Sequence, residues 1–142
     1  MSQIGNHAFM RRFVEFLNTA SPKLAAELIS PHAVFQAPMS GAEFQGPDGY
    51  VEMLSHVRKS FPDVRWEVED VVGEGNVLVA RFVITGTHQG EFQGIAPTGR
   101  VVRISAMNLY RLKAGKVMRE FAQFDHWSLM WQLGVYPQMN AG

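Results

Sequence analysis

The hydrophobic pattern of this chain changes its period about once, and that change limits the possible folds more than any other feature. Over roughly the first sixty residues, apolar side chains recur at the spacing of a helix face. From about Val64 they alternate with polar side chains, as they do along strands. Helices followed by a run of strands indicate an α+β fold, with the helices packed on one face of an antiparallel sheet.

The N-terminal part predicts three helices, over residues 2–18, 22–30 and 46–61. The first has an apolar face that includes Phe9, Phe13 and Phe16. Ser21 and Pro22 form an N-cap followed by proline at the first helical position. We expect Pro31 to end the second helix, and a short strand to follow at residues 33–37.

The C-terminal part predicts four strands and a closing helix over residues 125–133. The strands are expected at residues 64–72, 77–88, 100–112 and 117–124, joined by tight turns at 73–76 and 113–116 and by a glycine-rich loop at 89–99. Alternation places Trp66, Val68 and Asp70 on one face of the first strand. Both faces of the sheet carry apolar residues, so we expect a homodimer to cover the face that the helices leave open.

Size and charge exclude several classes of protein. At 142 residues the chain is predicted to be a single domain over residues 1–142. Its 13 basic and 13 acidic residues give no net charge, whereas nucleic-acid-binding proteins and polybasic membrane anchors carry a basic surplus. No apolar run is long enough for a membrane helix, no signal sequence is visible, and cysteine is absent. We expect a cytoplasmic protein that binds neither nucleic acid nor membrane.

The common catalytic and metal-binding motifs are also missing, including phosphate loops, HExxH and GxSxG. The five histidines are not spaced as metal ligands, so we expect no metal site. His32 at a helix-to-strand corner and His88 at a strand end have two open interpretations: they hydrogen-bond a loop backbone, or they reach a pocket.

Two polar residues stand in apolar surroundings. Asp125 lies between an aromatic-rich strand and an apolar helix, so it is a helix N-cap, a general acid/base with a raised pKa, or both. Asn108 interrupts an apolar strand face and needs hydrogen-bond partners from the protein, water or a ligand, and a bond to a neighbouring loop is the alternative to a pocket role. We predict an apolar pocket between the helices and the inner sheet face. Its expected lining, from strand parity and aromatic content, is Phe35, Trp66, Phe82, Asn108, Phe121 and Trp127.

Three stretches resemble the SnoaL-like polyketide cyclases of the nuclear transport factor 2-like superfamily: GTHQGEFQGIAPTGR, MNLYRLKAGKVMREF and QFDHWSLMWQLG. The resemblance implies a cone-shaped α+β barrel in which a strongly curved, mainly antiparallel sheet wraps a long helix. It further implies dimerisation through the sheet and an intramolecular aldol cyclisation without metal or organic cofactor. Asp125, in REFAQFD, is similar to the family's general acid/base.

The chain departs from the family pattern at three positions. Phe121 stands where tryptophan is common, Asn108 where aspartate is common, and Glu120 where some members carry histidine. From the resemblance, the expected function is a small-molecule enzyme acting on an apolar carbonyl compound. The alternatives are a binding module of the same fold without chemistry, and an isomerase or epoxide hydrolase.

Overall fold

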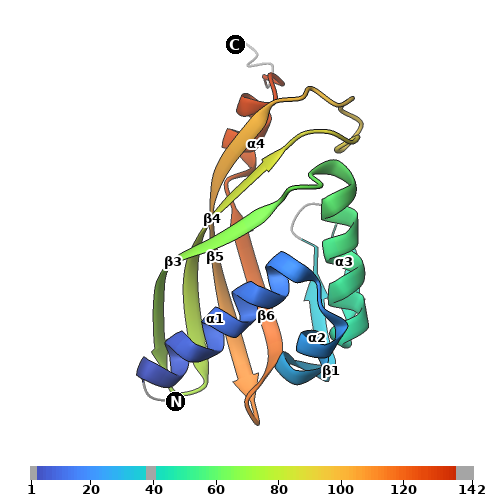
Figure 1. Ribbon diagram of the computed structural model, residues 1–142. Helices are drawn as coiled ribbons and strands as arrows, with labels where there is room; N and C mark the ends of the chain where they lie inside the picture. Colours follow the sequence, from blue (N-terminus) through green and yellow to red (C-terminus); the bar gives the residue numbers. More distant parts are fainter. Residues whose placement is uncertain (1–2, 38–40, 137–142) are drawn as a thin grey trace, which may run out of the picture.

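A curved sheet holding three helices against its concave side forms most of the molecule, with a fourth helix at one end (Figure 1). The computed structural model describes residues 3–37 and 41–136. The helices in these ranges are α1 (Gln3–Thr19), α2 (Pro22–Leu28), α3 (Gly46–Ser60) and α4 (His126–Gln132). The strands are β1 (Ile29–Gln36), β2 (Glu43–Gln45), β3 (Arg65–Glu74), β4 (Val77–Thr87), β5 (Val101–Lys113) and β6 (Lys116–Phe124).

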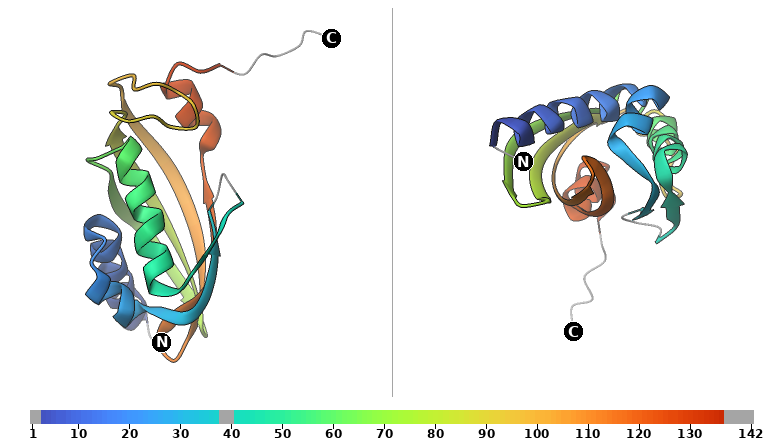
Figure 2. Two further views of the ribbon diagram at one scale, coloured as in Figure 1. Left: turned by 90° about the vertical axis from the view of Figure 1, so that its right-hand side faces the viewer. Right: turned by 90° about the horizontal axis from the view of Figure 1, so that it is seen from below.

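The six strands form one sheet in the order β2-β1-β6-β5-β4-β3. All neighbours are antiparallel except β1 and β6, which run parallel. Seen from below, the sheet curls around the space beside α3 (Figure 2). This confirms the expected α+β fold with a strongly curved, mainly antiparallel sheet. The sheet is not closed, however, because β2 and β3 are separate edges.

The predicted second helix and first strand meet earlier than expected. Helix α2 ends at Leu28, and Ile29 is already extended and paired with Val117 of β6. Pro31 therefore lies within β1 rather than ending a helix. It falls where the pairing with β6 is irregular, so its missing N–H removes no regular ladder bond.

Two β-bulges change which residues face the concave side of the sheet. In β3 the register shifts between Val68 and Asp70. Asp70 therefore points outward, where its carboxylate pairs with Arg81 at 2.7 Å, and its predicted place beside Trp66 and Val68 is wrong. In β6 the pairing of Arg111 with Arg119 and of Leu112 with Val117 leaves an extra residue on β6. Each bulge reverses the alternation of side chains beyond it.

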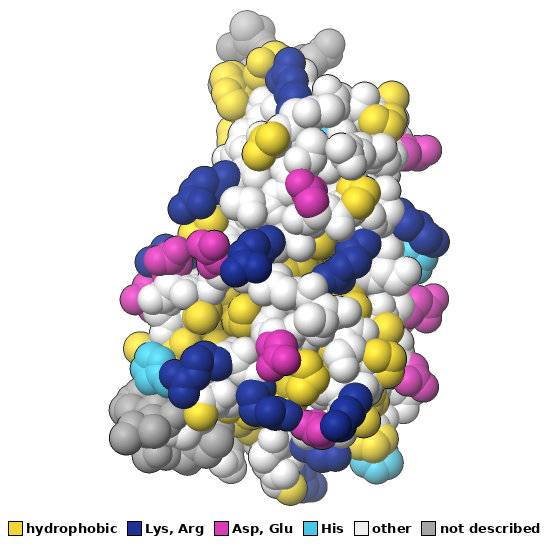
Figure 3. All heavy atoms as spheres, viewed as in Figure 1, with side chains coloured by type: hydrophobic (Ala, Val, Ile, Leu, Met, Phe, Trp, Pro, Cys, Tyr) yellow, Lys and Arg dark blue, Asp and Glu magenta, His cyan; other side chains and the backbone are white. Residues whose placement is uncertain are grey.

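The core lies between α1 and the concave face of the sheet. Met10, Phe13 and Phe16 of α1 are fully buried, and the Phe13 ring contacts that of Tyr110 on β5 at 5.1 Å between centroids. Acidic and basic side chains are interspersed on the face shown in Figure 3. Within residues 3–37 and 41–136, no helix is both long and apolar enough to cross a membrane.

Candidate active site

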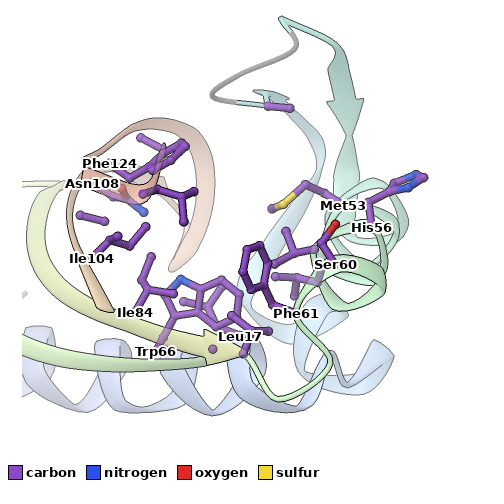
Figure 4. Close-up of a pocket in the computed structure, with 18 of the residues that line it drawn as sticks. Leu17, Met53, His56, Ser60, Phe61, Trp66, Ile84, Ile104, Asn108 and Phe124 are labelled. Carbon is purple, nitrogen blue, oxygen red and sulfur yellow. The ribbon is translucent and has the colours of Figure 1, made fainter. Parts of the chain in front are cut away.

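A cavity of about 540 Å³ lies between α3 and the concave face of the sheet. In Figure 4, Ile104, Asn108 and Phe124 on the sheet side face Met53 and Phe61 across the cavity. Other apolar lining residues are Leu17, Phe35, Phe44, Leu54, Val57, Val64, Trp66, Ile84, Val102, Phe92 and Leu129. Such a pocket, apolar with a few polar groups, is the usual form of a small-molecule site.

One carboxyl group stands in this apolar wall. Glu120 of β6 lines the cavity and pairs across the sheet with Tyr110 of β5. The hydroxyl of Tyr50, on α3, donates a hydrogen bond to Glu120 Oε1 at 2.8 Å. Tyr50 and Tyr110 are only 3 % and 0 % exposed. Sheet and helix therefore hold the carboxyl from two sides.

The environment of Glu120 shifts its pKa towards neutrality. Burial disfavours the charged carboxylate and raises the pKa to about 7, although hydrogen bonds from Tyr50 and Tyr110 partly oppose the rise. Burial, and then the nearby carboxylate, raise the pKa values of both tyrosines, so their hydroxyls stay protonated donors. Near pH 7, Glu120 is present in both forms and can accept or release a proton.

Asn108 is the polar neighbour of this group on β5. Its Nδ2 donates to the Tyr110 hydroxyl at 3.1 Å, and the amide lines the cavity. Because Tyr110 also hydrogen-bonds Glu120, the amide, the hydroxyl and the carboxyl form one connected chain. The prediction that an inward-facing amide at position 108 finds a polar partner is confirmed, but that partner is a side chain of the same strand rather than a neighbouring loop.

The loop between β4 and β5 closes one side of the cavity through Phe92 and Gln93. Its first residues are fastened to the end of α3, where Ser60 O accepts hydrogen bonds from the backbone N–H groups of Gln89 and Gly90. A Cβ at Gly90 would lie only 1.8 Å from Lys59 O, so this close approach requires glycine. The Phe92 ring packs against the Phe61 ring, with 5.4 Å between their centroids.

Of the predicted lining residues, Phe35, Trp66 and Asn108 meet in the cavity wall. Phe82 has the predicted orientation, because it pairs between Val68 and Ala106, but it is fully buried in the core. It does not belong to the cavity lining.

The two histidines lie outside the cavity lining. His32 is exposed on β1, because the inward positions of that strand are Ala33 and Phe35. His88 is 0 % exposed, and its Nδ1 accepts from the Thr98 backbone N–H at 3.1 Å, which confirms the loop-backbone interpretation for this residue. Its ring contacts Phe61, which does line the cavity.

Phe121 and Trp127 are turned away from the cavity. Phe121 is 49 % exposed, because the bulge in β6 reverses the alternation after Val117 and places Glu120 inside instead. Trp127 is 59 % exposed, because α4 turns Leu129 inward, together with Leu133 at its C-cap.

Asp125 occupies the N-cap of α4, where its Oδ1 accepts from the Ser128 N–H at 2.9 Å. The side chain is exposed and is not part of the cavity wall. The cap interpretation is therefore confirmed. Its role as acid/base stays a prediction, to be measured beside that of Glu120.

The contact between Glu120 and Tyr50 is not predicted by the periodicity of the sequence. Simple alternation from Val117 puts Arg119 and Phe121 inside, so only the β6 bulge reveals the inward carboxyl. Tyr50 belongs to the apolar face of α3, where a hydroxyl is easily taken for part of the core. Among the residues that the structure describes, no group of three or more histidine, aspartate or glutamate side chains is arranged to hold a metal.

The family model for SnoaL-like polyketide cyclase matches residues 7–133. The chain belongs to this family. The match spans the segments that form the cavity, from α1 to the end of α4.

Two curated relatives match most of the chain. Aklanonic acid methyl ester cyclase AcmA of Streptomyces galilaeus is 29 % identical over 128 residues, which is 89 % of either chain. Aklanonic acid methyl ester cyclase DnrD of Streptomyces peucetius is 27 % identical over 138 residues, covering 92 % of this chain and 88 % of the relative. Homologues of this SnoaL-like chain are thus named cyclases.

Solved structures show the same fold. IdmH from Streptomyces antibioticus superposes with a TM-score of 0.79 at 28 % identity, covering 92 % of this chain and 99 % of that one. TsrD from Streptomyces laurentii superposes with a TM-score of 0.83, covering 96 % of this chain and 99 % of that one. Because its identity is only 20 %, it supports the fold alone.

Proposed function

We propose that this SnoaL-like protein is an enzyme that closes a ring in an apolar carbonyl compound, with Glu120 as its general acid/base. The observation that carries the proposal is the Glu120 carboxyl in the wall of an apolar cavity, with a pKa raised to about 7. A group titrating near the working pH is best suited to proton transfer beside a carbonyl.

The proposed reaction is an intramolecular aldol addition. The Glu120 carboxylate removes a proton from the carbon next to one carbonyl, and the electron pair moves onto that carbonyl oxygen as an enolate. The enolate carbon attacks a second carbonyl of the same molecule, forming a C–C bond. The resulting alkoxide then takes the proton back from Glu120. These steps use side chains of this chain and require no metal or organic cofactor.

The cavity contributes by holding the substrate folded. Fixing two reacting groups of one molecule in near-attack geometry can lower a barrier by several kcal/mol. A volume of about 540 Å³ accommodates a molecule of several fused rings. The relatives AcmA and DnrD are named for aklanonic acid methyl ester, which supports a polycyclic carbonyl compound as the class of substrate.

Proton transfer can be tested before the natural substrate is known. In deuterium oxide, we expect the protein to accelerate exchange of the α-hydrogens of the bicyclic ketone α-tetralone, followed by mass spectrometry. Binding should quench the emission of Trp66, which lines the cavity. Ketone binding without accelerated exchange would favour the alternative of a binding module, and absence of both would contradict a small-molecule site.

We also propose a homodimer formed through the outer face of the sheet. Met107 and Phe121 are 53 % and 49 % exposed there, and Val101 is 73 % exposed. Sedimentation equilibrium at micromolar concentration should give twice the chain mass of 15.9 kDa. Met107→Glu is expected to shift the equilibrium towards the monomer, because a charge would lie in the apolar contact. A wild-type protein that stays monomeric would contradict this proposal.

A further inference from the structure

We propose that Asn108 binds the oxygen of the reacting carbonyl and stabilises the enolate that forms when Glu120 removes the neighbouring proton. This inference rests on the proposed function, because it names the group that completes the same site. It assigns Asn108 a defined role in the reaction, beyond that of a residue lining the pocket.

The first observation is the hydrogen-bonding capacity left on the amide. An asparagine side chain has two N–H donors and one carbonyl acceptor. Asn108 gives one N–H to the Tyr110 hydroxyl at 3.1 Å. Its second N–H and its carbonyl oxygen have no partner within residues 3–37 and 41–136, and the amide lines the cavity. A donor is therefore available to a ligand.

The second observation is a hollow around this amide, which we call the alanine niche. It consists of Ala122, directly opposite Asn108 on β6, and Ala106, two residues earlier on the same face of β5. Ala80, opposite Asn108 on β4, is fully buried and lies outside the cavity lining. Ala106, Ala122 and Asn108 all line the cavity. Since alanine has no side chain beyond Cβ, the niche leaves room for a ligand atom to approach the amide.

The third observation is the placement of the amide relative to the base. Asn108 lies opposite Ala122, so Glu120 is its diagonal neighbour on β6, at a typical backbone separation of about 7–8 Å. A carbonyl oxygen held by the amide would place the adjacent C–H towards the carboxylate. When the proton moves to Glu120, the electron pair of the broken C–H bond moves onto the oxygen that Asn108 holds.

The fixed network sets the direction of the amide. The Tyr110 hydroxyl hydrogen-bonds Glu120 and has one proton to give. When it donates that proton to the carboxylate, it can only accept from Asn108, so an amide N–H must point to Tyr110. Thus Tyr110 is a positioning residue, and Asn108 is the group expected to touch the substrate.

The test compares two ligands that differ in one oxygen. The ketone α-tetralone and the hydrocarbon tetralin share a bicyclic skeleton, and their affinities are measured by calorimetry near pH 8.5, where Glu120 is deprotonated and donates nothing. Wild-type protein should prefer the ketone. Asn108→Leu should lower ketone affinity about 10-fold while changing tetralin affinity less than about 3-fold.

Two further variants separate binding from packing. Asn108→Asp keeps the size of the side chain and, as the carboxylate, has no donor, so it should also lose the ketone preference. This variant provides the test if Asn108→Leu does not fold. Tyr110→Phe removes the hydrogen bond that orients Asn108 but keeps the amide, so the ketone preference should fall by less than in Asn108→Leu. In the exchange assay, Asn108→Leu should reduce kcat more than it raises KM, because the enolate oxygen carries more charge than the ketone oxygen.

Equal losses for ketone and hydrocarbon would overturn the inference, as would unchanged ketone affinity in both Asn108 variants or no ketone preference in the wild type. This result is separable from the proposed catalysis. A ketone preference that depends on Asn108, without accelerated α-hydrogen exchange, would retain the oxygen-binding role and refute Glu120 as acid/base. Exchange that depends on Glu120 but not on Asn108 would retain Glu120 as acid/base and refute stabilisation of the enolate by Asn108.

Discussion

Glu120→Gln is expected to reduce the rate of α-hydrogen exchange by roughly 10²–10⁴-fold, the usual contribution of a positioned acid/base. Glutamine keeps the length of the side chain, and its carbonyl oxygen can still accept the hydrogen bond that Tyr50 donates at 2.8 Å. It cannot take up a proton. Ketone affinity, measured by quenching of Trp66, should therefore change little while kcat falls.

Asp125→Asn is the matched control for this variant. Asparagine can still cap α4 by accepting the N–H of Ser128, so the fold should be retained. If Glu120 is the acid/base, Asp125→Asn keeps the wild-type rate. A folded Asp125→Asn variant without activity, beside an active Glu120→Gln variant, would return the catalytic role to Asp125.

The pH profile provides a second readout of the same prediction. The exchange step begins with the Glu120 carboxylate, so kcat/KM should rise with pH and level off above a midpoint near 7, the raised pKa of this group. Glu120→Gln should remove this rise. A midpoint near 4 would indicate an ordinary, solvated carboxylate instead.

The sequence was sufficient to predict the layers of this fold because its hydrophobic period is regular over long stretches. The alternation in β4, for example, predicts that Ala80, Phe82 and Ile84 share one face. In the structure all three lie on the concave face, opposite residues of β5. Helix α1 likewise buries Phe9, Phe13 and Phe16 as its pattern predicts. Local periodicity fixes such faces without knowledge of the neighbours.

The site was harder to predict because it depends on single insertions and on contacts between distant residues. Because of one extra residue in β6, Glu120 rather than Phe121 faces the cavity. Alternation of the sequence alone does not reveal this residue. The raised pKa of Glu120 further requires burial against Tyr50, which lies 70 positions away in sequence. Asp125 attracted attention because its local neighbours are aromatic, but the cap geometry at α4 directs its carboxylate to Ser128.

Chemical denaturation should reveal the energetic cost of keeping Glu120 in the cavity wall. Its pKa is about 7 in the folded protein, against an ordinary value of 4.5, so the native state binds this proton more tightly than the unfolded chain does. The stabilisation from this group is complete below about pH 4.5 and is lost as the pH rises through 7, which amounts to about 3 kcal/mol.

The difference between wild type and Glu120→Gln isolates this contribution, because all other titrating groups are shared. Glutamine carries no charge at any of these pH values, so the variant should gain about 2–3 kcal/mol relative to wild type between roughly pH 5 and pH 8. The inactive protein would then be the more stable one at pH 8, as expected where a buried carboxylate is retained for proton transfer rather than for folding. A stability difference that does not change with pH would mean that Glu120 titrates as an ordinary solvated carboxyl, and would remove the physical basis for its role as acid/base.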